Sequence, residues 1–199
     1  RDYSGSRGLG DVYKRQSGGC SACPAHSASP AGATAEAQCL CDAGYTGADG
    51  GPCVECSSGQ FKAAPGSGGC VACPANSISP AGAAAQVECV CDAGYTGGDG
   101  GPCVECVSGT FKAAAGSAEC STCPSLSTSP TGAGSEAACV CVPGAFGPGG
   151  SEGCAGCPPD HYCSGGASKE ACPASSTAPA GSGEEEACVC ASGFRKEGE

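Results

Sequence analysis

The stretch CDAGYTGGDGGPCVEC, residues 91–106, repeats CDAGYTGADGGPCVEC, residues 41–56, with one difference. Each copy is a glycine-rich loop bounded by cysteines. A loop of this kind can be a metal site, a reactive thiol centre or a structural element closed by disulfides. Because the surrounding chain repeats with it, the choice among these three readings decides the class of protein.

The composition requires cross-links. Cysteine accounts for 22 of 199 residues, which is typical of a disulfide scaffold in an oxidising compartment. Trp and Met are absent, and most of the 40% hydrophobic content is Ala and Cys. Such a chain cannot bury enough large apolar side chains to offset its conformational entropy. Disulfides or metal ions must therefore hold the fold together.

The charge and hydropathy exclude several partners. A net charge of −11 argues against nucleic acid and anionic membranes, since both need a basic face. No apolar run of about 18 residues could cross a bilayer. The chain begins without Met or a signal peptide and stops partway through a repeat, so we expect a fragment of a longer secreted chain.

The head of the chain differs from the rest. Residues 1–19 lie outside the repeats, and residues 1–16, RDYSGSRGLGDVYKRQ, contain four of the nine basic residues and no cysteine. They resemble translated read-through of a sequencing adapter, with a natural linker as the alternative. We leave them out of the fold argument.

The repeat itself has a period of about 50 residues. Its C-P cysteines are Cys23, Cys73, Cys123 and Cys172, and the second cysteines of its C-x-C pairs are Cys41, Cys91, Cys141 and Cys190, so that both series step by 50, 50 and 49 residues. We divide the chain into repeat 1 (20–69), repeat 2 (70–119), repeat 3 (120–171), whose second half diverges, and a truncated repeat 4 (172–199).

Regular secondary structure should be sparse, because Gly, Pro, Ser and Asp recur every few residues. The segments GQFKAA and GTFKAA could form short strands and GYTG a tight turn. The Ala-rich segments AGATAEAQ and AGAAAQVE could each form one helical turn.

Aromatic residues follow the period. One series, four or five residues after each C-x-C, is Tyr45, Tyr95, Phe146 and Phe194; the other, five residues after the following cysteine, is Phe61, Phe111 and Tyr162. An exposed binding stripe is one interpretation. As the largest side chains available, they are expected instead to pack on neighbouring disulfides as small cores.

Zinc binding is the main alternative to disulfides. Cys53-x2-Cys56 and Cys70-x2-Cys73 have a spacing close to that of four-cysteine zinc sites. However, every repeat adds a C-x-C pair. The two histidines, His26 and His161, recur in no other repeat and are expected to be solvated loop residues. We therefore predict no metal ligands and no cofactor.

In a sequential disulfide scheme, each cysteine pairs with the next one to close a short loop. Interleaved pairings would also consume the cysteines in twos. Each loop of about 15 residues would stabilise the fold by about 3 kcal/mol in the chain-entropy model. Cys20 and Cys190 are left over, as if their partners lay beyond the ends of a truncated chain. The predicted pairs are Cys23–Cys39, Cys41–Cys53, Cys56–Cys70, Cys73–Cys89, Cys91–Cys103, Cys106–Cys120, Cys123–Cys139, Cys141–Cys154, Cys157–Cys163 and Cys172–Cys188.

Residues 89–141 resemble the cysteine-rich, epidermal-growth-factor-like region of ephrin receptors. The shared pattern is a C-x-C, a GY loop, C-x-x-C, a GxFK segment, C-x-x-C-P, an SP-x-GA segment and another C-x-C. The resemblance extends over residues 20–190. It implies a small, disulfide-rich, elongated array of tandem modules with little regular secondary structure. The CxCDAGYTG piece also looks like the closing loop of epidermal-growth-factor and laminin modules, and the C-x-x-G-x-F loop is similar to one in tumour-necrosis-factor receptors.

No catalytic or calcium site is evident. The single Asp of GADGG or GGDGG lacks the acidic cluster of a calcium-binding module. Glu184, Glu185 and Glu186 fit a solvated charge run, and no serine, histidine and acid constellation repeats. The serines of SASP, SISP and STSP could carry O-linked sugar. The chain has no N-glycosylation sequon. We therefore expect that the protein is not an enzyme.

The expected function is structural. The array would serve as an extracellular stalk or interaction segment of a cell-surface or matrix protein, with other proteins or matrix components as partners and no membrane contact within this segment. A ligand-binding ectodomain like that of tumour-necrosis-factor receptors is the alternative, with the divergent stretch 141–172 as its candidate surface. An intracellular zinc-binding array is a remote third possibility.

Overall fold

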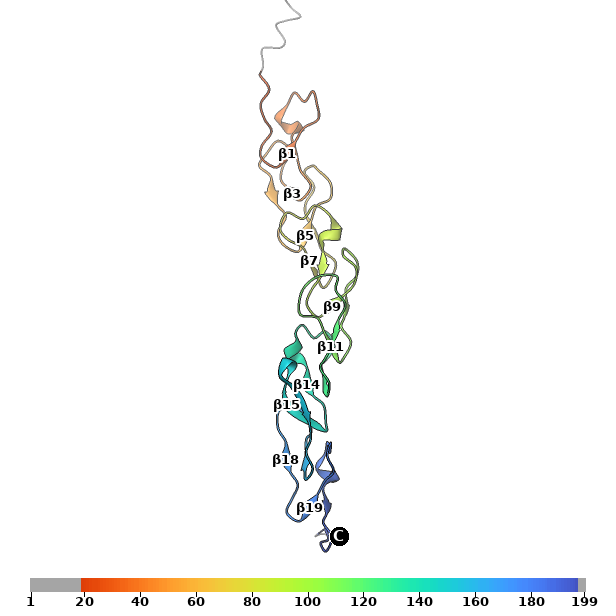
Figure 1. The fold of residues 1–199 in the computed structure, drawn as a ribbon. Coiled ribbons are helices and arrows are strands. Elements are labelled where there is room, and N and C mark those ends of the chain that lie inside the picture. The colour runs from red at the N-terminus through yellow and green to blue at the C-terminus, as the bar shows by residue number, and fades with distance from the viewer. Residues whose placement is uncertain (1–18, 197–199) are drawn as a thin grey trace, which may run out of the picture.

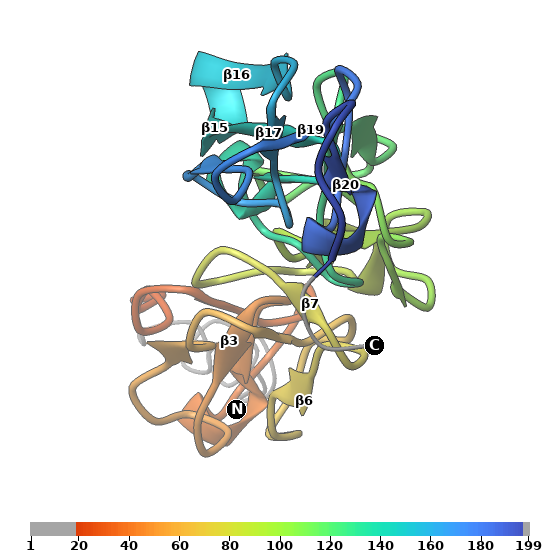
Figure 2. The same cartoon turned by 90° about the horizontal axis from the view of Figure 1, so that it is seen from below.

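The computed structural model describes residues 19–196, which form a long, narrow rod with the chain running from one end to the other (Figure 1). The expectations for residues 1–16 lie outside these described residues. Seen along the rod, the chain winds about the long axis: β3 (Tyr45–Thr46) and β6 (Val71–Ala72) lie on one side, and β15 (Ala145–Gly149) and β19 (Ser176–Thr177) on the other (Figure 2).

The strands all occur in antiparallel pairs, and almost all are two residues long. Gly and Pro punctuate the sequence so often that no strand can grow longer before a turn intervenes. The pairs are β1 (Ser27–Ala28) with β2 (Leu40–Cys41), β3 with β4 (Val54–Glu55), β5 (Gln60–Phe61) with β6, β7 (Ser77–Ile78) with β8 (Val90–Cys91), β9 (Tyr95–Thr96) with β10 (Val104–Glu105), β11 (Thr110–Phe111) with β12 (Ser121–Thr122), β13 (Ser127–Thr128) with β14 (Val140–Cys141), β15 with β16 (Gly153–Gly156), β17 (His161–Tyr162) with β18 (Glu170–Ala171), and β19 with β20 (Val189–Cys190).

Helical structure among residues 19–196 is limited to single 3-10 turns. They are η1 (Glu36–Gln38), η2 (Gln86–Glu88), η3 (Glu136–Ala138), η4 (Gly150–Glu152) and η5 (Glu185–Ala187). The first two confirm the predicted turns in the Ala-rich segments, and β5 and β11 confirm the predicted strands in GQFKAA and GTFKAA.

Each 50-residue repeat is built from three smaller units, which we call hairpin modules. A hairpin module begins at the first cysteine of a disulfide and contains one strand pair. Its fourth residue has a positive φ and leads directly into the first strand. That residue is a glycine in some modules, such as Gly44 and Gly59, and is His26, Asn76, Leu126, Asp160 or Ser175 in others. The ten modules begin at Cys23, Cys41, Cys56, Cys73, Cys91, Cys106, Cys123, Cys141, Cys157 and Cys172.

The disulfides of the structure join the same ten pairs as the sequential scheme. In nine of the modules, the second cysteine lies directly before or within the second strand, so that the disulfide closes the hairpin loop. The exception is Cys157–Cys163, which spans only 6 residues. Within the described residues, Cys20 and Cys190 have no disulfide partner.

Backbone hydrogen bonds join each module to its neighbours. The Gly44 amide donates to the Lys62 carbonyl at 2.8 Å, and the Gly59 amide donates to the Ser79 carbonyl at 3.0 Å. The Lys62 amide in turn donates to the Ala83 carbonyl at 3.1 Å. Because these bonds recur from one module to the next, the array grows by the same local contact in one direction, as expected of a solenoid-like repeat protein.

The core consists mainly of disulfides rather than large apolar side chains. Most of the deeply buried residues are half-cystines, including Cys41, Cys91 and Cys139 at 0% exposure. Phe61 is 9% exposed and packs with Ala83 and with Cys73 and Cys89 of the next module. For Phe61, this confirms the prediction of a small core beside a disulfide.

The turn predicted at GYTG lies two residues earlier in the chain than expected. The Tyr45 amide donates to the Asp42 carbonyl at 3.1 Å, so the turn spans Asp42 to Tyr45 with Gly44 at a φ of +81°. Tyr45 and Thr46 instead form β3. The glycine supplies the left-handed conformation that the turn requires, and the residues after it are free to pair.

Gly44→Ala is expected to destabilise the protein by about 1–3 kcal/mol more than Gly59→Ala. The two glycines have φ values of +81° and +80°, so both alanines incur the same backbone strain. A β-carbon at Gly44 would overlap with the Gly82 carbonyl oxygen and lie 2.9 Å from its carbon, whereas one at Gly59 would meet nothing within 4 Å. Denaturant unfolding of the two oxidised variants measures the difference, and equal losses would contradict this packing.

Candidate functional site

In six of the ten hairpin modules, the same position is buried at the contact with the neighbouring modules. It lies six residues after the first cysteine of the module, three residues beyond the positive-φ residue. In the modules that begin at Cys56, Cys73, Cys106, Cys123, Cys157 and Cys172, its side chain is at most 5% exposed. The residues at this position are Lys62, Ser79, Lys112, Ser129, Cys163 and Ala178.

Two of these residues are buried lysines. The Lys62 ammonium donates to the carbonyls of Tyr45 at 2.7 Å and Gly66 at 2.6 Å, and more distantly to those of Cys41 and Asp42, both at 3.4 Å. Three of the four acceptors belong to the preceding module. The side chain therefore ties one module to the next through the backbone rather than through an opposite charge.

Lys112 repeats this arrangement one period later. Its ammonium donates to the carbonyls of Tyr95 at 2.7 Å, Cys91 at 3.1 Å and Asp92 at 3.4 Å, and also to that of Gly116. A buried ammonium is costly unless its donors are satisfied. Here four carbonyl oxygens surround it, and no buried side-chain nitrogen or oxygen among the described residues lacks a partner.

These lysines were not recognised as structural from the sequence. Charged side chains are usually exposed, and the GxFK segment was read only as a strand and as part of a family pattern. A signal was available: between residues 17 and 168, Lys62 and Lys112 are the two basic residues of an acidic chain, and they lie 50 positions apart.

The serines Ser79 and Ser129 occupy the same position in other modules. Each is 2% exposed, and their hydroxyls donate to the carbonyls of Gln60 at 2.9 Å and Thr110 at 2.8 Å. The prediction that SISP and STSP could carry O-linked sugar is therefore wrong for these two residues, because the hydroxyls are buried and occupied.

Repeat 3 departs from this pattern where the sequence diverges. Cys163 takes the lysine position, and its carbonyl accepts from the Gly144 amide at 2.8 Å, as the Lys62 carbonyl does from Gly44. The Gly166 carbonyl, which corresponds to a lysine acceptor, accepts from the Gly147 amide at 3.0 Å. The hairpin β15–β16 is also longer and has an irregular register between Phe146 and Gly149.

The four cysteines of the zinc alternative lie in three different disulfides. Cys53 pairs with Cys41, Cys56 with Cys70, and Cys73 with Cys89. Zinc binds thiolates, and these sulfurs are already bonded. In the described part of the chain, no group of three or more His, Cys, Asp or Glu side chains could hold a metal ion.

The aromatic and histidine predictions have mixed outcomes. The His26 and Tyr45 rings stack, with centroids 4.1 Å apart and an angle of 6° between their planes, so His26 is not merely a solvated loop residue. Phe194 is 61% exposed, which contradicts its assignment to a core. Phe194 follows β20, the last strand of the described residues.

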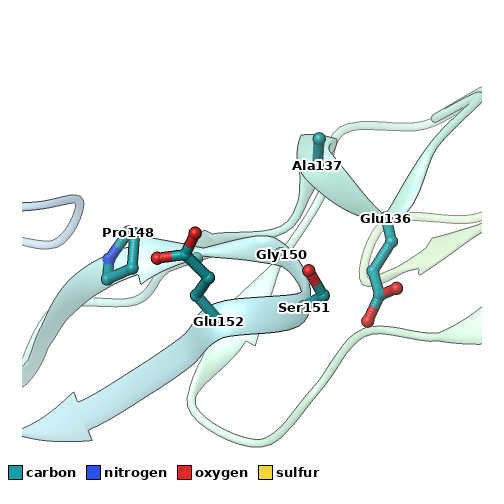
Figure 3. A pocket seen from close by; sticks show the side chains of 7 residues that line it. Glu136, Ala137, Pro148, Gly150, Ser151 and Glu152 are labelled. Carbon is teal, nitrogen blue, oxygen red and sulfur yellow. The ribbon is translucent and has the colours of Figure 1, made fainter.

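Two surface depressions lie among the described residues. One lies between η3 and η4 and is lined mainly by backbone and small side chains together with Glu136 and Glu152. Figure 3 shows that the carboxylates of these two residues do not point to a common centre. A second depression, beside Phe194, has Pro173, Ser176 and Cys190 among its lining residues.

The exposed surface of the described residues is strongly acidic. Lys62 and Lys112 are buried, so its cations are Lys169, Arg195 and Lys196. The Lys169 ammonium lies 5.1 Å from the centroid of the Phe146 ring. Desolvation raises the pKa of the Tyr162 phenol, and the carboxylates of Glu185, Glu170 and Glu186 raise it further.

The comparisons with known proteins identify the type of repeat. Residues 94–139 match the family model described as tyrosine-protein kinase ephrin type A/B receptor-like. The match covers less than half of the chain. It includes the Lys112 position and runs across the boundary between repeats 2 and 3. No curated protein matched the chain.

The match confirms the resemblance of these repeats to the ephrin-receptor-like cysteine-rich region. The fold is likewise the small disulfide-rich array that the resemblance implied, with ten disulfides and short hairpins. Among residues 19–196, no helix is long and apolar enough to span a bilayer.

Proposed function

We propose that these ephrin-receptor-like repeats form an extracellular stalk or interaction segment of a cell-surface or matrix protein, and that the segment has no enzymatic activity. The observation that carries the proposal is the series of ten disulfides, one in each hairpin module of a rod (Figure 1). Disulfides persist in secreted and surface proteins and are rare in reducing compartments.

The arrangement of the modules suits a spacer. Each module is hydrogen-bonded to its neighbours along the rod, so length increases with every repeat while the local contacts stay the same. The buried Lys62 and Lys112 strengthen the joints between modules. An acidic surface keeps such a rod soluble, and we propose other proteins or matrix components as its partners.

A second candidate function is ligand binding, as in tumour-necrosis-factor receptor ectodomains. The divergent half of repeat 3 supports it, because the longer β15–β16 hairpin and the contact of Lys169 with Phe146 give this part of the rod a surface unlike that of repeats 1 and 2.

A replacement of residues 120–171 by a second copy of residues 70–122, which ends at the position equivalent to the one before Cys172 and keeps every half-cystine paired, distinguishes the two functions. A spacer requires only length, so the stalk function predicts that the variant keeps the maximum dimension measured by small-angle X-ray scattering. It also predicts the same retention on cell-surface and matrix proteins in an array binding assay. Loss of a specific binding partner in the variant, with its dimensions unchanged, would instead support a ligand-binding ectodomain. Retention of the protein in the cytosol with reduced thiols would refute both.

A further inference from the structure

Repeat 3 exchanges a lysine and a cysteine between two positions. In repeats 1 and 2, Lys62 and Lys112 are buried, and the cysteine that precedes the second strand, Cys70 or Cys120, closes the disulfide. In repeat 3, Cys163 stands at the lysine position and closes the disulfide with Cys157. Lys169 stands directly before β18, as Cys70 stands before β6 and Cys120 before β12.

This exchange opens a gap in the coverage by disulfides. Between Cys23 and Cys188, only one or two residues separate successive disulfide loops at all junctions but one. Between Cys163 and Cys172, eight residues (164–171) lie outside any loop. A cut within a loop leaves both parts joined, whereas a cut within residues 164–171 separates the chain without reduction of any disulfide.

The same segment has the accessibility that a protease requires. Ser164 and the stretch 167–170 are exposed, and residues 163–169 form no strand or helix. Gly165 and Gly166 have φ values of +99° and +80° within the bend. Gly166 is held by backbone hydrogen bonds with Cys141 and Gly147, and Glu170 begins β18, so residues 167–169 are the most accessible part of the segment. Exposed segments with small and polar residues are preferred sites of proteolytic cleavage.

The charge of its lysine makes this segment a selective target for a protease that cleaves after basic residues. Within residues 19–188, the basic residues are Lys62, Lys112 and Lys169, and only Lys169 is exposed. The ammoniums of Lys62 and Lys112 are held by backbone carbonyls and cannot enter the acidic pocket of a trypsin-like enzyme without unfolding of the module. An enzyme that requires a cation before the scissile bond therefore meets one such residue along the disulfide-linked rod.

We propose that the Lys169–Glu170 peptide bond is a cleavage site for a trypsin-like serine protease. A water molecule supplies the oxygen of the new Lys169 carboxylate. The bond between the Lys169 carbonyl carbon and the Glu170 nitrogen breaks, and Glu170 becomes a new amino terminus. Repeats 1 to 3 are then released from everything that follows Lys169. The cleavage chemistry is independent of the proposed function, but its use to release a surface segment rests on the extracellular location.

Brief digestion of the full, oxidised protein with trypsin tests the proposal, with masses measured without reduction. Trypsin can also cut at basic residues before residue 19 or after Arg195, but these cuts change only the outer ends of the products. The test therefore depends on whether new ends form at Lys169 and Glu170. We expect two separate products that meet at this bond. Survival of the bond, or equally rapid cleavage after Lys62 or Lys112, would overturn the proposal.

Two variants serve as controls. Lys169→Gln should abolish the separation, and persistence of the two products in this variant would also overturn the proposal. Ala114→Lys adds an exposed lysine inside the Cys106–Cys120 loop. This second variant should be cut after residue 114, gaining the mass of one water while its parts remain joined until reduction. Measurement of free thiols in the same preparation tests the compartment separately, so failure of the cleavage and failure of the proposed function are distinguishable.

Discussion

Lys112→Ala is expected to lower the free energy of unfolding of the oxidised protein by about 2–4 kcal/mol, because buried carbonyls lose a charged hydrogen-bond donor. Lys112 is 4% exposed, and its ammonium serves four carbonyls in two modules. Unfolding in guanidinium measures the loss. Hydrogen exchange of the Gly116 amide, which donates to the Cys91 carbonyl at 2.8 Å, reports on the same site locally.

Two variants separate the ammonium from other effects. Lys112→Met keeps most of the buried methylene chain but removes the donor, so it should lose nearly as much stability as the alanine variant. Lys169→Ala removes an exposed lysine and should change stability by less than about 0.5 kcal/mol. If Lys112→Met were as stable as the unsubstituted protein, the role of the ammonium as a joint between modules would be wrong.

The double substitution Cys106→Ala, Cys120→Ala is expected to cost about 3 kcal/mol, and Cys157→Ala, Cys163→Ala about 2 kcal/mol, in the chain-entropy model. The first disulfide closes a loop with a sequence separation of 14, and the second closes one of 6. A longer loop restricts the unfolded chain more. Cys157 and Cys163 are both buried, whereas in the first pair Cys106 is buried and Cys120 is half-buried, so the cavity left by the second double substitution narrows the difference. Calorimetric or denaturant unfolding that reversed this order would contradict the chain-entropy account.

The disulfide framework could be anticipated because it depends on counting. Counting left interleaved pairings open, but the sequential scheme was the simplest one, and the structure has its pairs, with separations of 12 to 16 residues in all but Cys157–Cys163. The short strands β5 and β11 were predictable for a similar local reason. In each, a glycine with positive φ, Gly59 or Gly109, is followed by a two-residue strand that ends in an aromatic residue able to pack.

The hairpin modules could not be read from the sequence, although they are the real building blocks. Their fourth residue must adopt a left-handed conformation, but Gly59, His26 and Asn76 all supply it, so no single letter marks the position. The disulfide loops also differ in span, at 16, 12 and 14 residues in repeat 1, which hides the shorter period within the longer one.

The burial of side chains at the module contacts could not be predicted from the sequence either. General preferences place lysine at the surface and phenylalanine inside. Here Lys62 is 5% exposed and Phe194 is 61% exposed. The cause is tertiary in both cases. Carbonyl oxygens from the preceding module surround the Lys62 ammonium, whereas Phe194 follows the last described hairpin and has no aromatic partner.

The measurement that tests the central claim most directly is the intact mass of the secreted protein after alkylation, without and with prior reduction. A rod of disulfide-closed modules predicts that at most two cysteines, Cys20 and Cys190, react before reduction and that all 22 react afterwards. Peptide mapping without reduction should then recover the ten sequential pairs. Alkylation of most cysteines without reduction, together with bound zinc, would contradict the account and make the chain a metal-binding protein.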